Sequence, residues 1–211
     1  MKAQTTITDK KAALGFRAHS GWAVLVVLAG PSESPMVVER RRIDIADPKI
    51  AGSKQPYHAV EGLSLKDAEA LVSACTSASV QLATEAVRVA ITDAKQKGYE
   101  VSASGVLTGS GKPIPALEKI LASHPLLHTA EGELFRNVIV RACVNHHLPV
   151  VAVKEKELMV RAQNDIGISG ELIEQHLQRM GKAIGAPWRQ DEKYAGLAAW
   201  IASSVQRSMN C

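Results

Sequence analysis

An unbroken apolar run, WAVLVVL at residues 22–28, limits the possible folds of this chain more than any other feature. Neither of its alternating faces carries a charged side chain, which is typical of a strand that is buried on both sides of a sheet. Turn-forming residues bound the run, with Ser20-Gly21 before it and Gly30-Pro31 after it. The sequence therefore predicts a strand that is covered on both faces.

Two further strands are predicted next to this run in the sequence. Residues 12–17 form a short apolar segment that ends at the first turn, and residues 36–45 alternate between polar and apolar side chains, as a half-exposed strand does. Because only a few residues connect the three segments, we expect them to pair as antiparallel neighbours.

Helices and strands alternate in the rest of the chain. After an irregular segment at residues 46–62, Ser64 and Asp67 form a capping-box pattern at the start of a long helix that Gly98 ends. Strands are predicted at residues 101–108 and 148–153, a helix at 115–147 with a break at His124-Pro125, and helices after 153 with breaks near 167–170 and 185–188. Crossovers of this kind favour parallel pairing. The predicted fold class is α/β, a five-stranded mixed sheet of three antiparallel and then two parallel strands flanked by helices.

Length and composition indicate one folded domain. A chain of 211 residues with 46% hydrophobic and 22% charged residues lies in the ordinary globular range. We expect a single domain over residues 1–211, with residues 1–11 as a flexible polar leader. No apolar stretch reaches the roughly 18 residues of a membrane span, and the leader has no apolar signal core, so we expect a cytoplasmic protein with no membrane partner.

The three cysteines, Cys75, Cys143 and Cys211, are too widely spaced for a disulfide framework or a zinc ribbon. Cys75 and Cys143 lie in apolar helical segments, where a buried and unreactive thiol is expected. Neither the cysteines nor the composition indicates an oligomeric state.

A net charge of +4 allows binding to nucleic acid or to phosphate groups but does not require it. Basic residues concentrate in one run, Arg40-Arg41-Arg42, on the half-exposed strand. The run has two interpretations. It either contacts nucleic acid, or it is a charged strand edge that discourages pairing with other sheets.

The order of elements and two local segments resemble a known family. LGFRAHSGWA at residues 14–23 resembles the strand-turn-strand opening of Holliday-junction resolvases, and QDEKYAGLAAW at residues 190–200 resembles the start of their last helix. The chain thus resembles the resolvase-like branch of the ribonuclease H-like fold. The resemblance implies phosphoryl chemistry with Mg²⁺ or Mn²⁺ as cofactor, and nucleic acid or a phosphorylated small molecule as partner.

The first strand departs from the family pattern. In the resolvase-like branch it reads Gly-x-Asp and its aspartate binds the catalytic metal, whereas this chain has Gly15-Phe16-Arg17. Two-metal chemistry requires several carboxylates, and of these only Asp191 or Glu192 remains at the expected edge. Both are candidate catalytic residues, and Asp191 is the candidate metal ligand. The candidates for a further acid are Glu39, Asp44 and Asp47.

Polar side chains are expected to converge at the carboxyl ends of the parallel strands, the usual ligand crevice of an open sheet. Cations, hydroxyl groups and the glycine-rich loop after residue 108 suit an anionic ligand. The candidate ligand-binding residues are Arg17, His19, Ser20, Thr108, Ser110, Lys112 and Lys193. The loop does not match a nucleotide-binding Walker A motif, because Pro113 stands where Ser or Thr should bind magnesium.

The histidines offer a second candidate site. His124 and His128 are four residues apart, and on a continuous helix they could bind a metal together with Glu131 or Glu133. Alternatively, Pro125 interrupts the helix and Thr129 caps a new one, whose dipole the two glutamates complement. His58 is a further candidate, because it lies in the longest irregular segment.

Three functions agree with these features, which leave open whether the chain is an enzyme. The first is a ribonuclease H-like domain that has lost the standard metal carboxylates and serves as a binding or divergent enzymatic module for nucleic acid or another phosphate-bearing ligand. The second is a divergent metal-dependent nuclease. The third is a non-catalytic protein-interaction domain that uses the helix at residues 64–97.

Overall fold

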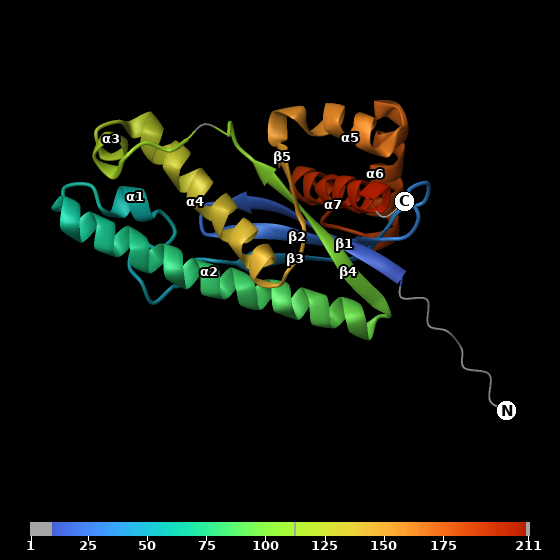
Figure 1. Ribbon diagram of the computed structural model, residues 1–211, viewed down its shortest axis with the longest axis horizontal. Coiled ribbons are helices and arrows are strands. Elements are labelled where there is room, and N and C mark those ends of the chain that lie inside the picture. Colours follow the sequence, from blue (N-terminus) through green and yellow to red (C-terminus); the bar gives the residue numbers. More distant parts are fainter. Residues whose placement is uncertain (1–9, 112, 210–211) are drawn as a thin grey trace.

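Five strands form one mixed sheet in the structure, a computed structural model that describes residues 10–111 and 113–209 (Figure 1). The strands are β1 (Lys10–His19), β2 (Trp22–Ala29), β3 (Met36–Asp44), β4 (Tyr99–Thr108) and β5 (Val150–Lys154). Their order is β3-β2-β1-β4-β5, with antiparallel pairing from β3 to β1 and parallel pairing from β1 to β5. The predicted fold class is confirmed. Residues 1–9 of the expected leader lie outside the described residues, and Lys10 and Lys11 belong to β1.

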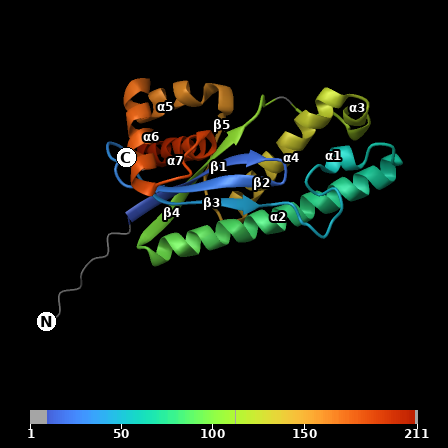
Figure 2. The same cartoon turned by 180° about the vertical axis from the view of Figure 1, so that it is seen from behind.

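Helices cover both faces of the sheet. They are α1 (Pro56–Ala59), α2 (Leu65–Gln96), α3 (Leu117–Leu121), α4 (His124–Asn145), α5 (Leu158–Ile166), α6 (Gly170–Ile184) and α7 (Gln190–Met209), with a 3-10 turn, η1 (Glu155–Glu157). Figures 1 and 2 show α2 and α4 on one face and α5, α6 and α7 on the other. The inner strand β2 is buried along residues 23–29, as its apolar run predicts.

Alternate residues of β1 enter the two cores. Leu14 and Phe16 pack with the apolar sides of α2 and α4, whereas Ala13 packs with α5, α6 and α7. Ser64 caps α2 and accepts a hydrogen bond from the backbone N–H of Asp67, as the capping-box pattern predicts. Cys75 and Cys143 are free thiols and are buried as expected, while Cys211 lies outside the described residues. Among residues 10–111 and 113–209, none of the helices has the length and apolar character needed to cross a membrane.

Two glycines allow α7 to lie directly against the sheet backbone. A Cβ on Gly15 in β1 would stand 1.9 Å from the carbonyl oxygen of Ala195, and a Cβ on Gly105 in β4 would stand 2.1 Å from that of Ala198. Only glycine leaves room for so close an approach. This contact fixes the first turn of α7 beside the end of β1.

The start of α4 differs from one of the two sequence interpretations. A single helix begins at His124, with Ser123 as its N-cap and Pro125 in its first turn, and it continues to Asn145. The predicted break between two helices is present at residues 122–123, between α3 and α4, but the prediction that Thr129 caps the new helix is wrong. Proline is tolerated in a first turn because the N–H that it lacks would have no partner within the helix. The irregular segment before α2 also contains the short helix α1.

Candidate functional site

One arginine joins two carboxylates at the carboxyl ends of β1 and β5. Arg17, near the end of β1, donates hydrogen bonds to both carboxylate oxygens of Glu155, from Nη2 at 2.7 Å and from Nε at 3.2 Å. Its Nη1 donates to Oδ1 of Asp191, the second residue of α7. The guanidinium also lies 5.0 Å from the ring centroid of Tyr194. We call Arg17, Asp191 and Glu155 the Arg17 cluster.

The Arg17 cluster has a net charge of −1 when both carboxylates are ionised. The side chain of Arg17 is 15% exposed, against 28% for Asp191 and 39% for Glu155, so the cation is the most enclosed of the three groups. Guanidinium groups keep their positive charge and match carboxylates in bidentate geometry. Arg17 therefore neutralises part of the negative charge that two converging carboxylates create at this edge.

A stack of rings continues from the Arg17 cluster to the sheet edge. His19 Nε2 lies 3.2 Å from Oδ1 of Asp191, and the His19 ring stacks on Trp22 with centroids 4.2 Å apart. The guanidinium of Arg42 covers the Trp22 ring at 4.0 Å from its centroid. The contacts thus run without interruption from Glu155 to the basic strand β3.

Two hollows flank the Arg17 cluster. The first is a basic hollow, which lies on the β3 side and is lined by Trp22, Val24, Arg40, Arg41, Arg42, Pro187, Arg189, Asp191 and Glu192. The second lies on the β5 side and is lined by Thr108, Gly109, Ser110, Glu155, Lys156 and Tyr194. Both contain cationic side chains next to a carboxylate of the Arg17 cluster.

The structure brings together part of the predicted ligand-binding set. Arg17 and His19 both contact Asp191, and Thr108 and Ser110 lie in the hollow next to Glu155. The remaining three are Ser20, an exposed turn residue, Lys193, half-buried in the first turn of α7, and Lys112, which lies outside the described residues.

The two candidate catalytic acids have different roles in the structure. Asp191 belongs to the Arg17 cluster, whereas Oε2 of Glu192 accepts a 2.7 Å hydrogen bond from the backbone N–H of Arg189 at the start of α7. The three further acids have partners of their own. Glu39 pairs with Arg41 and Lys97, Asp44 pairs with Arg42, and Asp47 accepts from the N–H of Lys49.

Sequence reasoning missed Glu155, so the expectation that only Asp191 or Glu192 remains at this edge is wrong. Glu155 directly follows β5. The rule that locates ligand crevices at the carboxyl ends of parallel strands would have identified it. Tyr194 and Arg189 were also missed, because their positions depend on how α7 and the loop before it pack on the sheet.

A resident Mg²⁺ or Mn²⁺ ion does not fit the Arg17 cluster as it stands. Catalytic divalent ions need several free carboxylate oxygens, with paired ions about 3.5–4 Å apart. Here the N–H groups of Arg17 take up both oxygens of Glu155 and one oxygen of Asp191. The guanidinium supplies the positive charge that a metal would supply.

Comparison with known proteins identifies the fold but no sequence family. No protein-family model matches the sequence, and no curated protein matches it either. Among the solved structures that match, two are similar across nearly the whole chain. The structure of Thermus thermophilus RuvC matches with a TM-score of 0.52 at 10% identity, covering 94% of this chain and 96% of that one. RuvC of T. thermophilus in complex with a Holliday junction substrate matches with a TM-score of 0.54 at 10% identity and the same coverage. The chain has the ribonuclease H-like fold.

These matches confirm the resemblance seen in the sequence at the level of fold. The resolvase-like arrangement of strands and of the terminal helix is present, although the sequences are only 10% identical. At so low an identity the likeness carries no function by itself, because one fold serves many activities. The function has to be argued from the Arg17 cluster and the basic hollow.

Proposed function

We propose that this protein is a nucleic-acid-binding module in which Arg17 takes the place of the metal ion at the carboxyl edge of the sheet. The observation that carries the proposal is the Arg17 cluster, in which one guanidinium binds the carboxylates of Asp191 and Glu155. A permanent, covalently attached cation stabilises these acids without a metal. The module therefore binds phosphate groups without the ions that hydrolysis requires.

The basic hollow next to the Arg17 cluster suits a phosphodiester backbone. Arg40 and Arg42 line it from β3, and Arg189 lines it from the loop before α7. The guanidinium of Arg40 is held at the hollow by a 3.2 Å hydrogen bond that its Nη2 donates to the carbonyl oxygen of Gly185. Arginine and lysine contacts to phosphates supply most of the sequence-independent affinity for nucleic acids.

The Arg40-Arg41-Arg42 run divides into two functional parts. Arg41 points to the α2 side, where it pairs with Glu39 and with Asp93 at 2.5 Å. Arg42 is held over Trp22 and by an exposed 3.2 Å hydrogen bond from its Nε to Asp44, so its guanidinium is fixed in position before a ligand arrives. Prior ordering of this kind lowers the entropy that binding must overcome. Arg40 and Arg42 are therefore the phosphate-binding members of the run.

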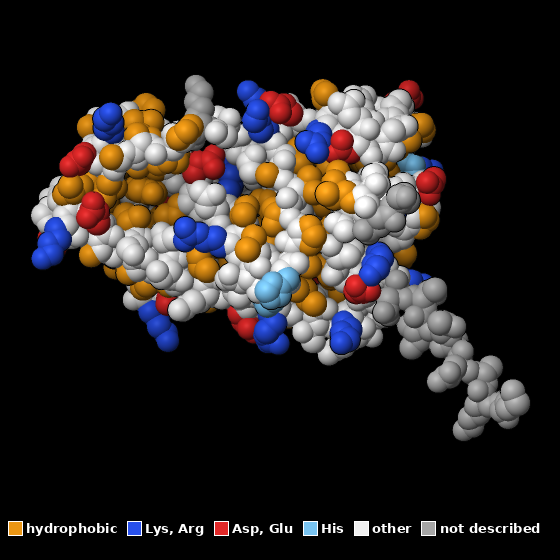
Figure 3. All heavy atoms as spheres, in the orientation of Figure 1, with side chains coloured by type: hydrophobic (Ala, Val, Ile, Leu, Met, Phe, Trp, Pro, Cys, Tyr) orange, Lys and Arg blue, Asp and Glu red, His pale blue; other side chains and the backbone are white. Residues whose placement is uncertain are grey.

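The arrangement of arginines in the basic hollow supports nucleic-acid binding more than the charge of the surrounding surface does. On the face seen in Figure 3, Lys and Arg side chains are interspersed with Asp and Glu, and no band of one charge crosses the face. A general positive field is thus not what would attract nucleic acid to this face. The RuvC neighbour bound to a Holliday junction makes branched DNA the ligand class to test first.

Salt-dependent binding to a labelled four-way DNA junction tests the proposal. Arg40→Ala and Arg42→Ala should each weaken binding and reduce the slope of log affinity against log salt concentration by about 0.9, the value for one lost phosphate contact. Arg88→Ala is the matched control, since Arg88 is an exposed arginine on α2 that pairs with Glu85. Equal effects of all three substitutions would contradict the proposal.

Two outcomes would favour other functions. Junction cleavage that requires Mn²⁺ or Mg²⁺ and is lost in Asp191→Asn would contradict a metal-free module and support a divergent nuclease. Failure of the wild-type protein to bind single-stranded, duplex or branched nucleic acid, together with a mass that rises with protein concentration, would support a protein-interaction domain that uses α2.

A further inference from the structure

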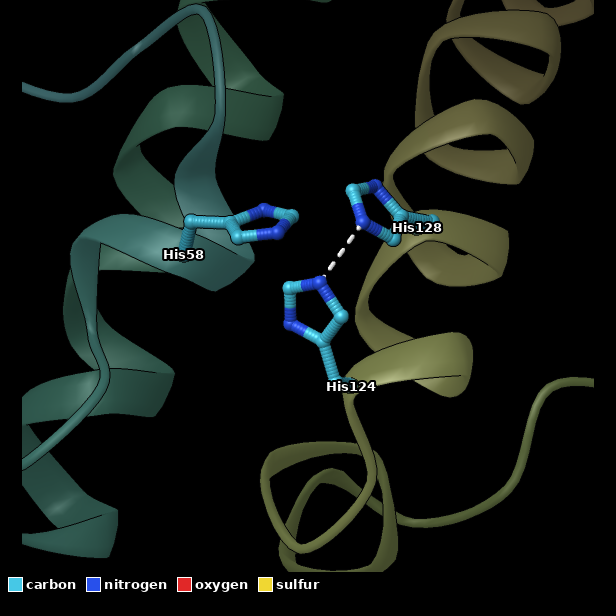
Figure 4. Close-up of side chains that lie close together, drawn as sticks. All are labelled: His58, His124 and His128. Atoms are coloured by element: carbon cyan, nitrogen blue, oxygen red, sulfur yellow. Dashed lines mark hydrogen bonds between the residues drawn. The ribbon is translucent and has the colours of Figure 1, made fainter.

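Three histidines converge where α1 meets the start of α4, outside the Arg17 cluster. Figure 4 shows His58 on one side and His124 and His128 on the other, with their rings directed toward a common point. One ring nitrogen from each lies within 4.8 Å of the other two. Nε2 of His124 and Nε2 of His128 are 3.0 Å apart.

The continuous helix α4 produces half of this arrangement. Residues four apart lie on the same face of a helix, so His124 and His128 lie one above the other in the first turns of α4. His58 comes from α1, and its ring lies 4.9 Å from the ring of His128 and 5.8 Å from that of His124. Both histidines of α4 are exposed and His58 is half-buried, so an ion can reach the point between them.

A buried glutamate orients His58. The side chain of Glu131 is only 3% exposed, and its Oε1 accepts hydrogen bonds from the backbone N–H groups of Tyr57 and His58 at 2.9 and 3.2 Å. The same oxygen lies 3.1 Å from Nδ1 of His58. Two N–H groups point at Oε1, so this oxygen carries no hydrogen and can only accept. Its contact with Nδ1 is therefore a hydrogen bond that Nδ1 donates. His58 therefore carries its hydrogen on Nδ1, which leaves the lone pair of Nε2 free for a metal.

Hydrogen bonding of this kind characterises metal-binding histidines. A ligand histidine usually donates its second N–H to a carboxylate or carbonyl group, which fixes the ring and makes it a better ligand. Oε2 of Glu131 is also buried and has no hydrogen-bond partner among the described residues. Glu131 thus stands, through its Oε1, where such a supporting carboxylate is expected.

We propose that His58, His124 and His128 bind a Zn²⁺ ion, with Glu131 as the residue that positions His58. Imidazole nitrogens suit zinc, and Zn–N bonds of about 2.0–2.1 Å in a tetrahedron place ligand nitrogens roughly 3.4 Å apart. The observed separations, from 3.0 Å to a maximum of 4.8 Å, bracket that value. Small rotations of the two exposed rings complete the geometry. Three protein ligands leave the fourth position open to water.

Bound zinc would join two segments that are distant in sequence. α1 lies in the connection between β3 and α2, and α4 lies in the connection between β4 and β5. The ion would link these two connections at one end of the molecule. A small apolar cluster of Ile120, Leu127 and Ala130 lies there as well, with Tyr57 packed against it. Binding of an ion to the folded form alone stabilises that form.

Zinc titration of protein stripped with a chelator tests the proposal. Wild type should bind about one Zn²⁺ per chain by calorimetry, and His124→Asn and His128→Asn should lose that binding. His147→Asn is the matched control, because His147 is exposed and has a positive φ of 57°, which asparagine tolerates. No zinc binding by wild type, or equal binding by His124→Asn and His147→Asn, would overturn the proposal.

Two further measurements separate a metal site from a structural role of the same residues. Glu131→Gln should keep the stoichiometry but weaken Zn²⁺ binding by about 10–100-fold, the usual effect of losing a supporting carboxylate. Co²⁺ in place of Zn²⁺ should give wild type, but not His128→Asn, the strong visible absorption of a four-coordinate ion. Unchanged affinity in Glu131→Gln would refute the positioning role, and identical Co²⁺ spectra in the two proteins would refute the site.

Discussion

Substitution of Gly15 by alanine should push α7 away from the sheet and lower the stability of the protein. The new Cβ would stand 1.9 Å from the carbonyl oxygen of Ala195 and 2.7 Å from the amide nitrogen of Ala199. Restoring a separation of 3.0 Å from that oxygen requires a shift of about 1.1 Å, the difference between 3.0 and 1.9 Å. Both clashing atoms belong to helix backbone, so no side-chain rotation relieves the contact. Overpacking of a core costs about 1–3 kcal/mol, and we expect Gly15→Ala to reach the upper end of that range.

Urea denaturation followed by circular dichroism measures this loss as a lower midpoint with an unchanged slope. Gly132→Ala in α4 is the matched control, because its Cβ would meet chiefly the movable guanidinium of Arg136, at 2.8 Å. Alanine favours a helix by about 1 kcal/mol over glycine, so Gly132→Ala should be neutral or stabilising. A midpoint for Gly15→Ala within error of wild type would refute the backbone contact between α7 and β1.

Two further predictions concern charge at the sheet edge and in the core. Arg17→Asp should place a third carboxylate beside Asp191 and Glu155, so millimolar Mn²⁺ should raise the melting temperature of this variant and not that of wild type. At a free Mn²⁺ concentration of 100 Kd, binding to the folded form alone would add about 2.7 kcal/mol to the free energy of unfolding. An equal rise in both proteins would contradict the account of the Arg17 cluster. Burial raises the pKa of the Cys143 thiol to about 11, so at about pH 8 a thiol reagent should label neither Cys143 nor buried Cys75 in a folded Cys211→Ser variant. Labelling should begin only as urea unfolds the chain, and prompt labelling of the native protein would disprove that burial.

The strands were predictable because their evidence is local. An apolar run identifies β2, alternation identifies β3, and short connections fix antiparallel pairing of β1, β2 and β3. The ends of helices were also predictable where a local pattern marks them, as at the Ser64 cap of α2. The start of α4 was not, because Pro125 is compatible both with a first turn and with a break.

The Arg17 cluster could be predicted only in part. The place of Arg17 on the first strand follows from the resemblance to resolvases, yet its partners Glu155 and Asp191 are 138 and 174 residues away in the chain. Such contacts depend on the packing of α7 against β1, which two glycines permit and no periodic pattern reveals. The histidine cluster could likewise be predicted only in part, since His58 meets His124 only after α1 and α4 have packed together.

The position of α7 in the chain has a consequence for biosynthesis. A ribosome makes β1, β2 and β4 before α7, and at about 5–20 residues per second the stretch between β1 and α7 takes of the order of ten to thirty seconds. During that interval the sheet face that contains Ala13, Leu28 and Ala103 has no α7 to cover it. A nascent chain in this state presents apolar surface to chaperones and to its neighbours. Because Asp191 arrives on the same helix, the apolar face is covered and the acid reaches Arg17 in one late step of folding.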